Sequence, residues 1–300
     1  MEQKNYIVYL CYGSDTLYEC AFSLLTLSQL YKPEELANTE IWLYTDNASF
    51  FESFKGCWLP LHFRHIDAAV LKEWRGSIDF SHRVKIEILR EMAADRTGNI
   101  FYLDSDTVFT QRLDKPFADI ANGELYMHVM EGYIKDRHNP ILDKLASHLE
   151  KDATMQISEK ELPHLAMWNA GVLGFDTKYR YLLDKALNYT DTEYPKFPKH
   201  VVEQFAFSVC FQREGHVKAA SPYVLHYWVV KELRGILRSF FRHFAHNSWD
   251  QLTRYSRAIQ VHVIMQEKIS FLHNRGMAQS IIKQHWNPQP MNWDELIKQL

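Results

Sequence analysis

The sequence predicts an α/β protein in which helices flank a mixed, mainly parallel sheet and a helical extension follows. Two observations predict this fold class. Short apolar segments alternate with longer ones in which apolar residues recur every three or four positions, as in strands that alternate with helices. Gly13, Asp46 and Asp104 stand where three of the short apolar segments end. Such alternation is typical of βαβ units, and sheets of this kind bind ligands beyond the carboxyl ends of their strands.

The first part of the chain alternates regularly. Residues 6–13 read YIVYLCYG, which predicts a buried strand that ends at Gly13. Residues 16–31 follow with Leu17, Leu24 and Leu27 near helical spacing, which predicts a helix. The same patterns predict strands at 40–47, 61–67 and 99–109, a short helix at 50–57, and a helix at 81–98 that stops near Gly98.

The second part is less regular. Apolar segments predict further strands at 124–131, 167–176 and 223–230, and helical spacing predicts helices at 140–162 and 200–211. From Lys231 onward the pattern is helical and basic. We therefore expect a catalytic domain over residues 1–232 and a helical extension over 233–300.

Composition excludes several classes of protein. The 300-residue chain has 24% charged residues and a formal net charge of -3, which is not typical of a nucleic-acid-binding protein. No run of about 18 apolar residues predicts a transmembrane helix, and no signal peptide is recognised, so we expect a cytoplasmic protein. The four cysteines form no CxxC pair, and Cys11 and Cys20 are expected to be reduced core residues.

The segment GNIFYLDSDTVF (98–109) carries the most specific motif. A strand interior disfavours aspartate, yet Asp104 and Asp106 follow an apolar run with one serine between them. Two carboxylates at a strand end can bind a hard cation such as Mg²⁺ or Mn²⁺, and such ions often bridge to phosphate. The alternative is a turn whose aspartates accept backbone hydrogen bonds.

A series of segments in this order resembles the GT-A glycosyltransferases, especially the family-8-like retaining enzymes: HRVKIEIL, IFYLDSDTVF, WNAGVLGFD, EQFAFS and VLHYWVVKE. The resemblance spans roughly residues 5–232 and implies a Rossmann-like GT-A fold. It implies that Asp104 and Asp106 hold Mn²⁺ or Mg²⁺ against the diphosphate of a nucleotide sugar, and that His226 completes the metal site.

The resemblance also implies roles around the donor. Lys85, with Arg83 beside it, matches a basic donor contact on the helix before the DxD strand. The remaining matches are Asn169, Ala170 and Gly171 at the sugar, and Glu203 and Gln204 near the reacting carbon. From their places after the first two strands, Tyr12 is expected to stack on the base, and Asp46 either to contact base or ribose or to cap the next helix.

Two positions depart from the family pattern. The motif His-x-x-Gly-x-x-Lys-Pro-Trp is absent; here the chain reads His226-Tyr-Trp-Val-Val-Lys231, with the lysine one position early. Glu203 stands where the family has aspartate. A phosphate contact by Lys231 is still expected.

The resemblance implies transfer of a hexose, with retention, from a nucleotide diphosphate sugar to a saccharide or lipid-linked saccharide acceptor. UDP-glucose and UDP-galactose are the donors that the resemblance favours. Three alternatives stay open. A dehalogenase-type phosphatase also carries Asp-x-Asp, but its motif continues Gly-Thr and lies near the N-terminus. A nucleotidyltransferase would have a glycine-rich loop after the first strand, where CYGSDTLYE has one glycine. The third alternative is a non-catalytic nucleotide-sugar-binding protein.

The segment KELRGILRSFFRHFAH (231–246) predicts a basic amphipathic helix. Arg234, Arg238 and Arg242 recur every four residues and share one helix face. Apolar residues supply much of the rest: Ile236, Leu237, Phe240, Phe241 and Phe244. Such a helix either lies on an anionic membrane surface, which would suit a lipid-linked acceptor, or packs on the catalytic domain with its arginines in solvent.

Overall fold

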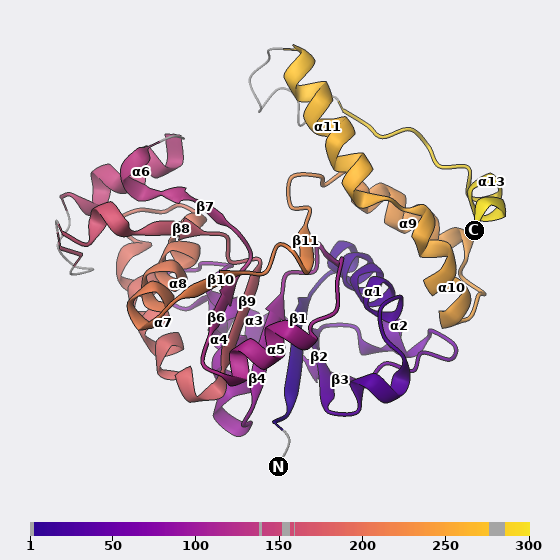
Figure 1. The fold of residues 1–300 in the computed structure, drawn as a ribbon, viewed down its shortest axis with the longest axis horizontal. Coiled ribbons are helices and arrows are strands. Elements are labelled where there is room, and N and C mark those ends of the chain that lie inside the picture. Colours follow the sequence, from indigo (N-terminus) through magenta and orange to yellow (C-terminus); the bar gives the residue numbers. More distant parts are fainter. Residues whose placement is uncertain (1–2, 138–139, 152–156, 159, 276–285) are drawn as a thin grey trace.

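The computed structural model describes residues 3–137, 140–151, 157–158, 160–275 and 286–300. A seven-stranded sheet forms its centre (Figure 1), with the strand order β10-β6-β9-β4-β1-β2-β3. These strands are β1 (Asn5–Cys11), β2 (Thr39–Thr45), β3 (Leu61–His65), β4 (Asn99–Leu103), β6 (Leu125–Met127), β9 (Val172–Asp176) and β10 (Val217–Ala219). Two small sheets pair β5 (Thr107–Phe109) with β11 (Val224–His226) and β7 (Met130–Tyr133) with β8 (Ala166–Trp168).

The main sheet is mixed and mainly parallel. Strand β1 pairs in parallel with β2 and β4, β2 with β3, and β6 with β10. Strand β9 runs antiparallel to its neighbours β4 and β6. The predicted α/β class with a mixed, mainly parallel sheet is therefore confirmed.

Helices cover both faces of this sheet, because side chains of a strand alternate between its faces. On β1, Ile7 and Tyr9 enter one apolar core and Tyr6 and Val8 enter the other. The first core is covered by α1 (Ser14–Ser28), α2 (Ala48–Glu52), α5 (Asp114–Ala121), α9 (Leu233–His243) and α10 (Trp249–Tyr255). The second is covered by α3 (Ala68–Arg75), α4 (Arg83–Asp95), α7 (Tyr181–Glu193) and α8 (Val201–Glu214).

A third, smaller core lies beside the sheet. Helix α6 (Pro140–Leu149) packs there against one side of α8 and against β8 through Leu142, Leu145, Met167 and Phe205. In Figure 1 this part forms an arm opposite the C-terminal helices, which also include α11 (Val261–Arg275) and α13 (Trp293–Leu296). Short 3₁₀ turns lie at Pro33–Leu36, Ile134–Asp136, Leu162–His164, Thr177–Tyr179, Ser256–Ala258 and Ile297–Gln299.

Several predicted boundaries are wrong. The strand predicted at 99–109 breaks after Leu103 and resumes as β5, and the strand predicted at 167–176 breaks into β8 and β9. The strand predicted at 223–230 keeps only β11, and the helix predicted at 140–162 ends at Leu149, its later part including residues outside those described. Each broken strand turns where its polar residues enter the cavity described below.

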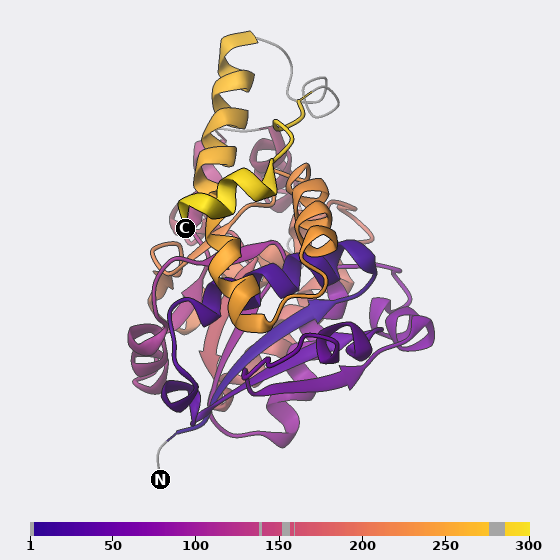
Figure 2. The same cartoon turned by 90° about the vertical axis from the view of Figure 1, so that its right-hand side faces the viewer.

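The C-terminal extension packs on the rest of the protein. The apolar residues of α9 lie in the same core as α1, and Figure 2 shows α9 and α10 lying over α1. Of the two alternatives for this helix, its apolar face packs on the catalytic domain, because Leu237 and Phe240 are fully buried in that core. Of the arginines, Arg234 pairs with Glu19 and Arg238 with Asp15. None of the described helices is long and apolar enough to span a bilayer.

Candidate active site

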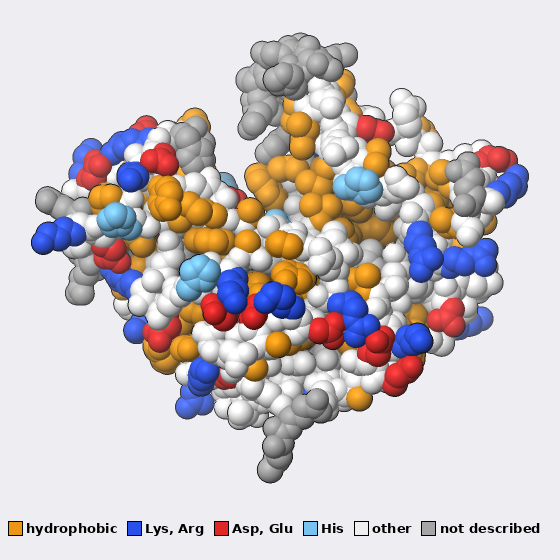
Figure 3. Space-filling model, in the orientation of Figure 1, with side chains coloured by type: hydrophobic (Ala, Val, Ile, Leu, Met, Phe, Trp, Pro, Cys, Tyr) orange, Lys and Arg blue, Asp and Glu red, His pale blue; other side chains and the backbone are white. Residues whose placement is uncertain are grey.

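A cavity of about 1120 Å³ opens at the carboxyl ends of β1 and β4. Its walls come from the arm on one side and from the segment after β11 on the other, and Figure 3 shows the notch between these parts. Most predicted site residues line it: Tyr12, Lys85, Asp104, Asp106, Asn169, Ala170, Gly171, Glu203, Gln204, His226 and Lys231. The structure thus brings together residues from distant parts of the sequence.

Three backbone connections hold the DxD turn in this cavity. The Asp104 N–H donates to the Gly171 carbonyl at 2.8 Å, which joins the turn to the segment before β9. The Asp106 carbonyl accepts from the Tyr227 N–H at 3.0 Å. The β5–β11 ladder pairs Thr107 with His226, and this register puts the histidine next to Asp106. Carboxylates can end this buried strand because they face a cavity instead of the apolar core.

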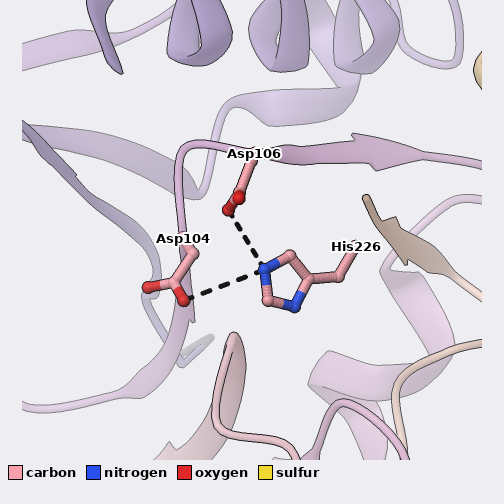
Figure 4. Close-up of side chains that lie close together, drawn as sticks. All are labelled: Asp104, Asp106 and His226. Atoms are coloured by element: carbon pink, nitrogen blue, oxygen red, sulfur yellow. Dashed lines mark hydrogen bonds and ion pairs between the residues drawn. The ribbon is translucent and has the colours of Figure 1, made fainter. Parts of the chain in front are cut away.

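Asp104, Asp106 and His226 form a compact group (Figure 4). The His226 Nε2 lies 3.0 Å from Asp106 Oδ1 and 4.0 Å from Asp104 Oδ2. One ligand atom from each residue lies within 4.8 Å of the others. Asp106 and His226 are buried, while Asp104 is partly exposed to the cavity.

The hydrogen bonds of Asn169 determine the tautomer of neutral His226. The Asn169 Oδ1 accepts from the Gly171 N–H at 3.0 Å, so this atom is the amide oxygen and must also accept from His226 Nδ1, 3.0 Å away. With its proton on Nδ1, a neutral His226 directs the lone pair of Nε2 at the two carboxylates. A lone pair facing carboxylates repels them unless the ring is protonated or a cation lies between.

This donor set fits a divalent cation. Two carboxylates and one imidazole are a common set of metal ligands. In such sites the second nitrogen of the imidazole usually donates a hydrogen bond that fixes the ring, as His226 Nδ1 does here to the amide oxygen of Asn169. Mg²⁺ prefers oxygen ligands throughout, so the imidazole favours Mn²⁺. Asp104, Asp106 and His226 would hold the ion.

Two lysines surround the carboxylates. The Lys85 ammonium lies 3.3 Å from Asp104, 3.4 Å from Glu203 and 2.8 Å from the Ala170 carbonyl. Burial lowers the pKa of Lys85, but the charges of Asp104 and Glu203 outweigh burial and hold the pKa above its usual value. Lys85 therefore stays charged and donates hydrogen bonds to Asp104 and to the Ala170 carbonyl in the wall of the site.

Lys231 approaches from the other side. Its Nζ lies 2.6 Å from Asp106 Oδ2, and its side chain is 52% exposed. Burial raises the pKa of Asp106, but the hydrogen bond and charge of His226 and the charge of Lys231 outweigh it and hold the pKa well below its usual value. Asp106 is therefore ionised, as a metal ligand must be.

Sequence reasoning missed Glu131, which joins two predicted sugar-site residues. Its Oε1 accepts from Asn169 Nδ2 at 3.0 Å and its Oε2 from Gln204 Nε2 at 2.8 Å. A hydrogen-bonded chain thus runs from Gln204 through Glu131 and Asn169 to His226. Its signal in the sequence was an acid at the end of the strand predicted at 124–131, the same signal that singled out Asp46 and Asp104.

Sequence reasoning also missed Glu19 on α1. Its side chain is fully buried, accepts from Ser105 Oγ at 3.3 Å and pairs with Arg234 at 2.8 Å. Ser105 is the central residue of the DxD turn, so Glu19 connects the turn to the C-terminal helix α9. The only signal for it was an acid inside the apolar stretch of the helix predicted at 16–31.

Two predicted site residues do not line the cavity, which corrects their expected donor contacts. Arg83 turns away and pairs with Asp191 at 2.7 Å and Glu87 at 2.9 Å. Asp46 accepts from the Gly13 N–H at 3.2 Å, and the cap of the next helix is Asn47 instead. Gly13 has a φ of 82°, which only glycine adopts without strain, so Asp46 supports the turn that carries Tyr12.

No protein-family model and no curated protein matches the chain. Among solved structures, the galactosyltransferase LgtC in complex with donor and acceptor sugar analogs is similar with 13% identity over 72% of this chain and 73% of that one, with a TM-score of 0.47. Mouse xyloside xylosyltransferase 1 has 13% identity over 72% of this chain and 85% of that one, with a TM-score of 0.45. The glycosyltransferase GlyE of Streptococcus pneumoniae has 12% identity over 84% and 62%, with a TM-score of 0.49. All three are glycosyltransferases.

Proposed function

We propose that this chain is a metal-dependent glycosyltransferase that moves a hexose from a nucleotide diphosphate sugar to a hydroxyl of a saccharide or lipid-linked saccharide. UDP-glucose and UDP-galactose are the favoured donors by the resemblance of the motifs. One observation carries the proposal: Asp104, Asp106 and His226 bring one ligand atom each within 4.8 Å of the others at the carboxyl end of β4, inside a cavity of about 1120 Å³. Mn²⁺ is the proposed cofactor.

The cation, when bound, neutralises negative charge on the departing diphosphate. Lys231 adds positive charge on the same side, because it contacts Asp106 and keeps half of its side chain exposed. In the proposed reaction the bond between the anomeric carbon and the diphosphate oxygen breaks, and the acceptor oxygen forms the new bond. The acceptor proton passes to the departing diphosphate oxygen, as expected for attack on the same face with retention.

The sugar is proposed to lie against Asn169 and Gln204. The Gln204 Nε2 donates to Glu131 and its Oε1 lies 3.5 Å from the Ala170 N–H, so the amide has a fixed orientation toward the cavity. Glu203 is buried behind it and contacts Lys85, so Gln204 is the better candidate for contact with the reacting carbon. Substitution of Gln204 by alanine should lower kcat much more than nucleotide affinity.

The test uses UDP binding and donor hydrolysis, which need no acceptor. UDP should bind tightly only with Mn²⁺ present, and UDP-glucose or UDP-galactose should be slowly hydrolysed. Asp104→Asn and Asp106→Asn, tested separately, should each abolish Mn²⁺-dependent binding. Asp250→Asn, the same change on the exposed surface of α10, is the control and should leave it unchanged.

Two results would contradict the proposal. Full Mn²⁺-dependent activity in Asp104→Asn or in Asp106→Asn would show that these aspartates do not hold the metal. UDP-sugar binding without any hydrolysis or transfer would favour the non-catalytic binding protein instead.

A further inference from the structure

The cavity has a second basic wall away from the metal ligands. Lys144 comes from α6, and Lys199 and His200 come from the segment that enters α8. None of these residues belongs to the motifs that identified the metal and donor residues. They line the same cavity as Gln204 and Glu131.

The helix geometry places this wall close to the proposed reaction centre. His200 and Gln204 are four residues apart at the start of α8, so they share one face, with Cβ atoms about 5–6 Å apart. Pro140, Ile141 and Lys144 likewise share one face of α6 and line the cavity. A ligand at Gln204 is therefore about one helical turn from the basic wall.

The charge of this wall is not neutralised by the protein. The cations near the metal ligands have acidic partners: Lys85 has Asp104 and Glu203, Lys231 has Asp106, and Arg234 has Glu19. By contrast, within the part of the chain that the structure describes, the side-chain ammonium of neither Lys144 nor Lys199 has an ion-pair or hydrogen-bond partner. The N-termini of α6 and α8 also meet the cavity here and add partial positive charge.

Trp228 supplies an apolar surface in the same cavity. It follows β11 and is 47% exposed although large apolar side chains are usually buried. A flat indole can cover the apolar face of a sugar ring while the ring's hydroxyls reach polar neighbours. Trp228 together with the basic wall therefore fits a sugar that also carries negative charge.

We infer that the acceptor is an anionic saccharide, with a phosphate or carboxylate group within about one sugar unit of the accepting hydroxyl. This inference rests on the proposed function. The donor diphosphate does not account for the basic wall, because it must lie at Asp104, Asp106 and His226, where Lys231 already stands. Lys144 and Lys199 are the specificity residues of this acceptor site.

The test measures sugar binding by calorimetry with UDP and Mn²⁺ already saturating, so that added anions cannot occupy the diphosphate position. Glucose is compared with glucose 6-phosphate and with glucuronic acid, which separates phosphate from carboxylate recognition. At least one anionic sugar should bind about ten-fold more tightly than glucose, because hydrogen bonds to a charged group are stronger than those to a neutral hydroxyl. The preference should weaken at high salt.

Three variants complete the experiment. The double variant Lys144→Gln/Lys199→Gln should lose the preference, while Lys72→Gln, an exposed lysine of α3 outside the cavity, should keep it. Trp228→Ala should weaken all three sugars alike. Equal binding of neutral and anionic sugars, or an unchanged preference in the double variant, would overturn the inference. Failure of UDP and Mn²⁺ to bind in the first step would instead contradict the proposed function.

Discussion

The arrangement of Asp104, Asp106 and His226 depends on how closely the backbone at Gly171 approaches the His226 ring. A Cβ atom built on Gly171 would lie 2.2 Å from both Nδ1 and Cε1 of the His226 ring and 3.0 Å from Asn169 Oδ1. The ring cannot yield without losing its hydrogen bond to Asn169. Glycine is therefore required at this position for space.

Gly171→Ala should displace the His226 ring and leave the fold intact. Because loss of a residue that orients a ligand typically costs about 10–100-fold in metal affinity, Mn²⁺ binding should weaken by that order. Titration followed by electron paramagnetic resonance of free Mn²⁺ measures it. Gly215→Ala is the control, since its Cβ would meet nothing within 4 Å, and equal Mn²⁺ affinity in both variants would contradict the prediction.

Glu203 should make the protein less stable as the pH rises toward neutrality. Burial raises the pKa of Glu203 to about 7 although Lys85 opposes this, whereas the unfolded chain has an ordinary glutamate. The unfolded state therefore loses its proton first, and the folded state must bury a charge between about pH 4.5 and 7. Glu203→Gln removes this dependence and keeps the size of the side chain beside Lys85.

Denaturant unfolding in the presence of a chelator tests the Glu203 prediction. The unfolding free energy of Glu203→Gln relative to wild type should rise by on the order of 3 kcal/mol between pH 4.5 and 7.5. Parallel stability curves for the two proteins across this range would show that Glu203 has no raised pKa.

Residue types in motif order were enough to find most of the residues that line the cavity, but not Glu131 or Glu19. Both act through hydrogen bonds to residues 38 to 215 positions away, and neither has a local pattern that specifies such partners. Arg83 shows the reverse case. It stands beside Lys85 in the sequence, but neighbouring positions on a helix point in different directions, and Arg83 faces α7 instead.

At the scale of elements, α9 is joined to the DxD turn through a buried ion pair. Glu19 on α1 is fully buried. It accepts two hydrogen bonds from Arg234 and one from Ser105. Burial raises the pKa of Glu19, while the hydrogen bond from Arg234 lowers it and so favours its charged form. Removal of Arg234 alone would leave this carboxylate buried without its partner.

Arg234→Met should therefore lower the unfolding free energy by about 3–5 kcal/mol, the typical cost of breaking a buried pair. The double variant Glu19→Gln/Arg234→Met should recover much of this loss, since no unpaired charge remains. Arg238→Met, one turn further along α9 with a 44% exposed side chain paired to Asp15, should cost less than about 1 kcal/mol. Equal losses of unfolding free energy in the Arg234 and Arg238 variants would show that the Glu19–Arg234 pair stabilises the protein no more than an exposed pair does.

The order of elements was predicted best where apolar periodicity is strong, from β1 to β4. Helices α3, α5 and α7 were missed because they are short or largely polar, as in YLLDKALNYTDTE of α7. Strand lengths were overestimated where an apolar run continues through a turn. At 99–109 and 167–176 apolar residues stand on both sides of the break, so the apolar pattern does not mark where the chain turns.

Across the whole molecule, one core crosses the boundary expected at residue 232. Helix α1 is buried on nearly all sides, from Glu19 to Ser28. The sheet covers one side and α9 and α10 cover the other, as Figures 1 and 2 show. A helix that is buried all round must be covered on both sides.

A fragment of residues 1–232 should therefore fail to fold cooperatively. It would lose Leu237, Phe240 and Trp249, and each buried side chain of this kind contributes roughly 1.5–3 kcal/mol against a net stability of about 5–15 kcal/mol. Near-UV circular dichroism and binding of a hydrophobic dye measure the outcome. A fragment with a native spectrum and a cooperative thermal transition would show that 1–232 is an independent domain.

The β5–β11 ladder has one more consequence. It comprises three residue pairs outside the main sheet, and a two-stranded ladder of that size is marginal in water. His226 lies in it, Asp106 adjoins it, and these two residues are 120 positions apart in the chain. A cation bound by both is a reversible cross-link that closes this long loop only while the ion is present. The concentration of this cation in the medium would then control how often the β5–β11 ladder opens locally. The amide protons of the central strands would exchange at the same rate with and without the ion.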